Sequence, residues 1–176
     1  MNTLITTDGS KEAITALRTA SRLLRKKGNE FDVLCVAPEL GASVGQAKEK
    51  RAKGGHARER YRSRIGQESM AILDDAATIL HENGIEPNLL SRIGSPADVI
   101  VKLAEDHDVT VVGAAARNHP ALAGLGSVAS RVVEHAEGLV LVARELASSD
   151  RIRVLVGLDG SLASTHALAA MAAYFD

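Results

Sequence analysis

The chain has 176 residues, and its formal net charge is −1 at pH 7. This length suffices for one ordinary domain with a buried core, and the charge balance excludes a general attraction to nucleic acid or to an anionic membrane. Aromatic residues make up 2% of the chain, which argues against base stacking on single-stranded nucleic acid. The single cysteine, Cys35, excludes an internal disulfide, and we expect it to be a small buried apolar residue.

Targeting and metal signals are missing from the sequence. No stretch approaches the roughly 18 continuous apolar residues of a membrane span, and the N-terminus lacks the apolar region of a signal peptide. The six histidines show no ligand spacing with a cysteine or carboxylate, so no metal site is predicted. We therefore expect a cytoplasmic protein that binds neither membrane nor nucleic acid.

The first elements are a strand over residues 3–7 and a helix that begins after Asp8, Gly9 and Ser10. Ser10 is predicted to cap that helix, whose apolar residues recur at helical spacing up to Gly28. Residues 31–36 predict a second strand.

Residues 39–55 have no clear period and predict a mobile loop. From residue 48 to residue 64 the sequence has eight lysines or arginines and two glutamates. The simpler interpretation is a solvated face where the loop meets a helix. The alternative is a positively charged lid over a bound polyphosphate.

Residues 56–83 predict a long helix, whose apolar side chains point inward, namely Ile65, Met70, Leu73, Ala77 and Leu80. A third strand is predicted over 85–93, with Pro87 at its start or on a sheet edge. Ser95 and Pro96 then have the residue types of an N-cap and a first helical position.

The segment from 109 to 136 carries the main functional signal of the sequence. A buried strand over 109–112 is followed by a loop with three glycines and by a helix that Ser127 opens and can cap. Glycines let the backbone approach a ligand closely, and the first turn of a helix offers unpaired N–H groups and the positive end of its dipole. This pattern predicts an anion site. A further apolar strand is predicted over 139–142.

Strands that alternate with helices predict an α/β fold with a parallel sheet covered on both faces. The spacing around the predicted anion site resembles the nucleotide loop of the universal stress protein family, which is G-x2-G-x9-G followed by Ser or Thr. The matching positions are Gly113, Ala116, Gly126 and Ser127, so alanine replaces the second glycine. The resemblance implies an open, doubly wound, Rossmann-like five-stranded sheet of order 3-2-1-4-5, similar to the adenine nucleotide alpha hydrolase fold.

The same resemblance implies an adenine nucleotide as ligand, ATP with magnesium, and a set of binding residues. Asp8 would face the adenine or ribose, and Val36 would offer backbone hydrogen bonds to adenine. Gly113, Ala116, Gly126, Ser127 and the backbone N–H of Val128 would surround the phosphates. Arg117 and His119 lie in the loop and either meet the phosphates or are exposed loop residues.

The C-terminal residues repeat the opening of the chain. Residues 155–161 align with residues 4–10 and share an Asp-Gly-Ser sequence after an apolar run. We interpret residues 1–145 as one unit, 146–151 as a link and 152–176 as the first strand and helix of a second, incomplete tandem unit. This short segment cannot bury its own core, so we expect it to dock on the sheet edge or on another copy. We therefore expect a homodimer that forms through the fifth strand and residues 152–176.

Three function classes remain open at this point. The first is a nucleotide-binding regulatory module for stress response, whose assembly or partner binding responds to ATP. The second is a dimeric interaction scaffold of the same fold without nucleotide, for which Ala116 is the argument. The third, an enzyme or phospho-receiver, lacks an identifiable catalytic base or a cluster of acids. We expect no enzyme activity beyond slow ATP hydrolysis.

Overall fold

The computed structural model describes residues 1–24, 28–39, 55–114, 124–146 and 153–174. In chain order the elements are β1 (Asn2–Thr7), α1 (Lys11–Leu23), β2 (Glu30–Ala37), α2 (Gly55–His81), β3 (Asn88–Ile93), α3 (Pro96–Ala104), β4 (Val109–Gly113), α4 (Ser127–His135), β5 (Leu139–Ala143) and α5 (Leu162–Tyr174). The strands form one parallel sheet of order β3-β2-β1-β4-β5. This confirms the predicted fold class and strand order.

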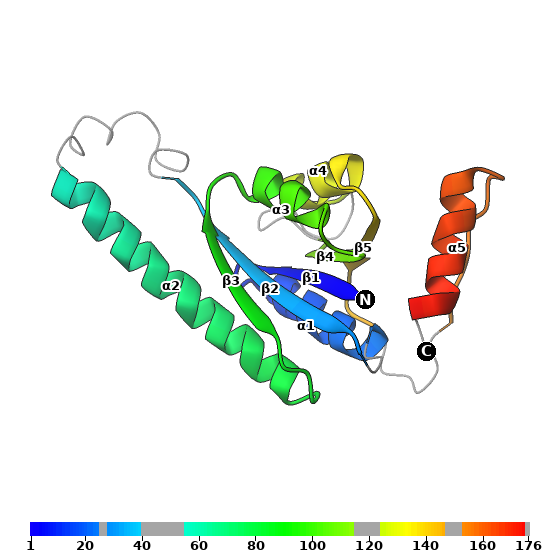
Figure 1. Ribbon diagram of the computed structural model, residues 1–176, viewed down its shortest axis with the longest axis horizontal. Coiled ribbons are helices and arrows are strands. Elements are labelled where there is room, and N and C mark those ends of the chain that lie inside the picture. The colour runs from blue at the N-terminus through cyan, green and yellow to red at the C-terminus, as the bar shows by residue number, and fades with distance from the viewer. Residues whose placement is uncertain (25–27, 40–54, 115–123, 147–152, 175–176) are drawn as a thin grey trace.

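Helices cover both faces of the sheet, with α1 and α2 on one face and α3 and α4 on the other (Figure 1). Two neighbouring residues of β1 show why the buried strands carry adjacent apolar residues. Leu4 packs in the core below α3 and α4, whereas Ile5 packs in the core against α1 and α2, and both are fully buried. Because successive side chains point to opposite faces, a strand covered on both faces needs a continuous apolar run.

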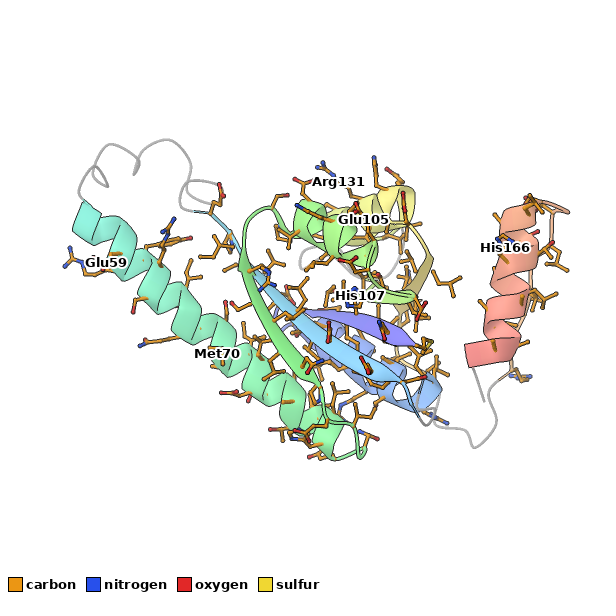
Figure 2. The ribbon with its side chains drawn as sticks, in the orientation of Figure 1. Glu59, Met70, Glu105, His107, Arg131 and His166 are labelled. Carbon is orange, nitrogen blue, oxygen red and sulfur yellow. The ribbon has the colours of Figure 1, made fainter. Side chains whose placement is uncertain are left out.

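The inward face of α2 differs from the prediction at one position. Met70 is 47% exposed, and Ser69 is buried in its place at 3% exposure (Figure 2). Ser69 lies four residues after Ile65 and four before Leu73, so it shares their face of the helix. The Ser69 side chain forms a hydrogen bond with the Cys35 thiol. This bond satisfies a polar group that would otherwise be costly to bury.

A polar cluster joins three elements at the amino edge of the sheet, opposite the carboxyl ends of the strands. His107, which comes just after α3, contacts Asp32 of β2 through Nε2 at 3.1 Å and the Leu103 carbonyl oxygen through Nδ1 at 2.6 Å (Figure 2). The amide of Asn88 in β3 donates to the other Asp32 oxygen at 2.9 Å. The cluster therefore ties β2, β3 and the end of α3 together.

The C-terminal segment does not join the sheet. The strand predicted over 152–158 is wrong for the described part, residues 153–158, which belong to no strand. α5 lies apart from the sheet and its four covering helices (Figure 1). Leu155 is 97% exposed and Leu162 is 79% exposed. A strand needs a neighbour for its backbone hydrogen bonds, and within the described part of the chain no strand pairs with this segment.

Across the described ranges, no helix combines the length and apolar character that crossing a membrane requires.

Candidate functional site

A pocket of about 590 Å³ opens at the carboxyl edge of the sheet, where β1 and β4 lie side by side but lead to helices on opposite faces. Ligands of open α/β sheets bind at such a switch point. The pocket is lined by Thr6, Thr7, Asp8, Ser10, Glu12, Ala13, Leu34, Val36, Pro96, Ile100, Val112, Gly113, Gly126, Ser127, Val128 and Ala129. The wall is mostly apolar at β2, β4 and α3, and polar at the ends of β1 and the starts of α1 and α4.

The first turn of α4 reaches the pocket without a side-chain cap. Its N-cap is Gly126, not Ser127 as the sequence predicted, and no side chain accepts a hydrogen bond from the first turn. The Gly126 N–H donates to the Ala114 carbonyl at 3.2 Å. Gly126 is extended, and α4 begins at Ser127. The first hydrogen bond within α4 runs from the Ser130 N–H to the Gly126 carbonyl at 2.8 Å. Three backbone N–H groups, of Ser127, Val128 and Ala129, therefore precede it.

The starts of α3 and α1 also lie at the pocket. Ser95 is the N-cap of α3, as predicted, but its side chain makes no cap hydrogen bond, and Pro96 occupies the first turn. The start of α1 is capped, because the Ser10 hydroxyl oxygen accepts from the Ala13 N–H at 3.2 Å. Three helix dipoles thus end at one pocket, and each end carries about half a positive charge.

Asp8 ends β1 in a tight turn. Its Oδ1 accepts a hydrogen bond from the Ser10 N–H at 3.0 Å, and the Thr7 hydroxyl oxygen accepts from the Gly9 N–H at 3.2 Å. Gly9 has φ +73°, and a Cβ there would lie 3.2 Å from the Ile72 side chain of α2. Glycine suits this position on both counts. The turn fixes the Asp8 backbone at the mouth of the pocket.

Gly113 ends β4 where the strand meets the first turn of α1. A Cβ at this position would lie 3.0 Å from the backbone carbon and oxygen of Glu12. The absence of a side chain therefore lets α1 pack against the end of β4. This close approach is to the chain's own backbone, so the prediction that Gly113 lets the backbone approach a ligand stays a prediction.

Six of the residues singled out from the sequence meet in this pocket: Asp8, Val36, Gly113, Gly126, Ser127 and Val128. Ala116, Arg117 and His119 lie outside the described residues. So does most of the loop expected over 39–55, together with residues 48–54 of the basic stretch.

Sequence reasoning missed Leu34, Pro96, Ile100 and Glu12, among others. The available signal was topological, since all of them lie at the carboxyl end of a strand or in the first turns of the helix that follows.

The ionisable groups among the described lining residues are Asp8 and Glu12. Arg131 of α4 is paired with Asp98 of α3 at 2.6 Å, and both side chains are about half exposed. Within the described ranges, no group of three or more His, Cys, Asp or Glu is arranged to hold a metal ion. The arrangement suits a ligand with an apolar ring system and a negatively charged group that meets backbone N–H donors.

Comparison with known proteins gives the family. The family model described as "Universal stress protein family" matches residues 1–144. The chain belongs to the universal stress protein family. Among curated proteins, no relative of this universal stress protein was found.

Solved structures share the fold of this universal stress protein. A universal stress protein from Archaeoglobus fulgidus DSM 4304 is 21% identical with a TM-score of 0.75, over 97% of this chain and 61% of that one. A universal stress protein in complex with cAMP is 22% identical with a TM-score of 0.59, over 83% of this chain and 98% of that one. An Arabidopsis thaliana family member with AMP bound is 18% identical with a TM-score of 0.56, over 84% and 93% of the two chains.

Proposed function

We propose that this universal stress protein is an adenine-nucleotide-binding regulatory module, whose assembly or partner binding responds to the bound nucleotide. The observation that carries the proposal is the pocket at the switch point, with the uncapped first turn of α4 at one side of it. Its volume of about 590 Å³ falls within the range of roughly 300–1,000 Å³ that small-molecule sites occupy. Two structurally similar family members hold cAMP and AMP, which supports the choice of ligand class.

The chemistry of the wall supports a separate place for the phosphates, the adenine and the ribose of a nucleotide. Phosphate oxygens accept hydrogen bonds from the N–H groups of Ser127, Val128 and Ala129, where the helix dipole also favours negative charge. The adenine ring packs on the apolar wall that Val36 and Ile100 form. The Asp8 carboxylate accepts from ribose hydroxyls, because ionised carboxylates are acceptors only.

The second part of the proposal is that the bound nucleotide regulates the protein and is not turned over at an enzyme rate. The described lining residues contain no histidine, lysine or cysteine, and Gly113 and Ser10 contribute positioning rather than proton transfer. We expect ATP hydrolysis, if measured by phosphate release, to stay at the level of a slow background. Release at tens of turnovers per second, which is an ordinary enzyme rate, would refute this part.

A homodimer is the assembly that we propose to respond to nucleotide. β5 is an edge strand, and four of its residues are half-buried apolar side chains, Leu139, Val140, Leu141 and Val142. An apolar edge strand is a template for pairing with another chain. Residues 153–174 add further exposed apolar surface, and we propose that they begin a second, tandem unit.

Thermal unfolding of the full chain with and without nucleotide tests the binding. A ligand that binds only the folded state raises the midpoint by mass action. We expect AMP and Mg-ATP to raise the midpoint and guanosine monophosphate to raise it less. The absence of any shift at millimolar concentrations of all adenine nucleotides would favour an interaction scaffold that binds none.

The variant Ala116→Gly restores the motif glycine and separates two causes of a missing shift. If the Ala116 methyl group obstructs the phosphates, the variant gains a nucleotide-dependent shift that the wild-type chain lacks. If the pocket has another role, both proteins stay unresponsive.

A further inference from the structure

We infer that two copies of this chain associate through the outer face of α2, with the two helices antiparallel. This contact goes beyond the proposed function, because α2 covers the sheet near β2 and β3, whereas β5 is the edge strand on the other side. α2 runs along the outside of the molecule (Figure 1). Its 27 residues span about 40 Å, which gives a partner a long, continuous surface.

The outer face of α2 is a regular stripe of exposed residues. Steps of three and four residues place its members on one side of the helix, opposite the buried side chains of Ile65, Ser69 and Leu73. In chain order the stripe consists of Arg60, Arg64, Gln67, Ala71, Asp74, Asp75 and Thr78. Because every member is exposed, the chain leaves this face open to a partner.

Charge is segregated along the helix. The first turn of α2 has no acidic residue. From residue 65 to residue 82 the sequence has four acidic residues and no lysine or arginine. Asp74 and Asp75 take part in none of the ion pairs among the described residues. The carboxyl half of the stripe is therefore negative.

Arg64 supplies the opposite charge in the amino half of the stripe. Its guanidinium lies 3.7 Å from the Glu68 carboxylate, and the two side chains are 67% and 60% exposed. Exposed pairs of this kind contribute little to stability, so Arg64 can exchange Glu68 for a carboxylate of a second copy. Because Arg60 already has an interaction of its own, Arg64 is the cation that we assign to the contact.

An antiparallel pair about a two-fold axis brings the opposite charges together. In such a pair each residue meets the one that lies equally far beyond the axis in the partner. Arg64 and Asp75 lie at nearly equal distances on either side of the midpoint between Gln67 and Ala71. An axis at this midpoint sets Arg64 of each copy level with Asp75 of the other. Uncharged residues then meet their own copies at the axis, and opposite ends of the two helix dipoles adjoin.

Sedimentation velocity of the full chain over a range of concentrations tests the contact at low salt and at about 0.5 M salt. One helix pair is a small interface, so we expect a weak association that appears as the concentration rises. Salt should weaken this association, because it screens exposed charges. Charge screening should not weaken a dimer held by the apolar side chains of β5 and residues 153–174, so the two steps can be told apart.

Reversing the charges isolates the pair. Arg64→Glu alone and Asp75→Arg alone should each weaken the low-salt association at least several-fold, because each places like charges across the contact. The double variant restores opposite charges across the two-fold axis and should recover most of the wild-type association. The matched control is Lys102→Glu at an exposed position of α3, which makes the same change of charge on the other face of the sheet and should leave the association unchanged.

Recovery in the double variant supports the antiparallel contact. A wild-type chain without a salt-sensitive association step overturns the inference and leaves the outer face of α2 to a partner of another kind. A double variant as weak as the single ones overturns it too. Neither result bears on nucleotide binding in the pocket, which thermal unfolding tests separately.

Discussion

Gly113 at the end of β4 approaches Glu12 in α1 so closely that an added Cβ would lie 3.0 Å from the Glu12 backbone carbon and oxygen. Backbone atoms of a helix cannot move aside as a flexible side chain can, so a methyl group here separates α1 from the sheet. We expect Gly113→Ala to lower the free energy of unfolding by about 1–3 kcal/mol. Urea denaturation measures the change, and nucleotide affinity should fall with it because both residues line the pocket.

Gly66 in α2 provides the matched control for that substitution. A Cβ at Gly66 meets no atom within 4 Å, and alanine is favoured over glycine inside a helix by up to about 1 kcal/mol. Gly66→Ala should therefore leave the chain as stable or more stable. Equal losses in the two variants would show that close packing at Gly113 is not the cause.

Cys35 should make the stability of the chain fall at alkaline pH. Burial raises the pKa of the Cys35 thiol above its ordinary value of 9.0; the hydrogen bond with Ser69 opposes this shift, and the nearby Asp8 carboxylate adds to it. A group whose pKa is raised in the folded state contributes stability that is fully present at pH values below its ordinary pKa. This stability is lost as the pH rises from the ordinary pKa through the pKa of the folded state. Urea denaturation from pH 7 to pH 10 measures the loss.

The variant Cys35→Ala is the comparison for this pH dependence, since it removes the titrating group. Its stability should change less between pH 8.5 and pH 10 than that of the wild-type chain. Identical alkaline slopes in the two proteins would mean that Cys35 ionises equally well in the folded and unfolded states.

The second Asp-Gly-Ser turn reproduces the first in its hydrogen bonds. Asp159 Oδ1 accepts from the Ser161 N–H at 2.9 Å, and the Ser161 hydroxyl oxygen accepts from the Ser164 N–H at 3.1 Å. Hydrogen bonds from the Ser161 side chain and backbone lower the pKa of Asp159 to about 2. Because the pKa is lowered, ionised Asp159 stabilises the turn at pH values above its ordinary pKa of 3.8. This stabilisation is lost as the pH falls from 3.8 through about 2.

Carboxyl-carbon NMR titration of Asp159 checks that geometry in solution. Ser161→Ala should move the Asp159 pKa toward its ordinary value of 3.8, and Ser164→Ala should move it less, because Ser161 provides the larger effects. An ordinary Asp159 pKa in the wild-type chain would show that the turn does not persist in solution.

The exposed apolar side chains of residues 153–174 should be covered by a second copy of the chain. Leu155 and Leu162 are 97% and 79% exposed, and large apolar side chains gathered on a surface mark an interaction site. We expect Leu155→Glu combined with Leu162→Glu to shift the sedimentation of a wild-type dimer toward monomer. The control, Ser63→Glu combined with Gln67→Glu on exposed positions of α2, adds the same charge and should leave the dimer intact. A monomeric wild-type chain would contradict the expectation.

Most of the fold was predictable from the sequence because the parallel sheet leaves a direct mark on it. Strands buried on both faces are mostly apolar runs, as at Val109–Gly113, where Thr110 is the polar residue. Ser10 precedes its helix with the residue type and spacing of a cap, which the structure confirms. The strand order required the family resemblance, because local patterns do not say which strands become neighbours.

Three features escaped sequence reasoning for physical reasons. Ser69 replaces Met70 in the core because a serine with a bonded hydroxyl can be buried, and hydrophobicity alone does not show the bond. The N-cap of α4 is Gly126 rather than Ser127 because the Gly126 N–H bonds to the Ala114 carbonyl, a tertiary contact. The strand expected over 152–158 has strand residues, but its described part, residues 153–158, pairs with no strand among the described residues.

Amide NMR spectra of the full chain with added AMP test the central claim most directly, because they report on the backbone donors of α4 themselves. We expect the N–H resonances of Ser127, Val128 and Ala129 to shift in a saturable way, while those of the Asp159 turn stay in place. Saturating AMP that leaves the α4 resonances unchanged, or shifts only residues outside the pocket, would contradict the claim that these N–H groups hold a nucleotide phosphate.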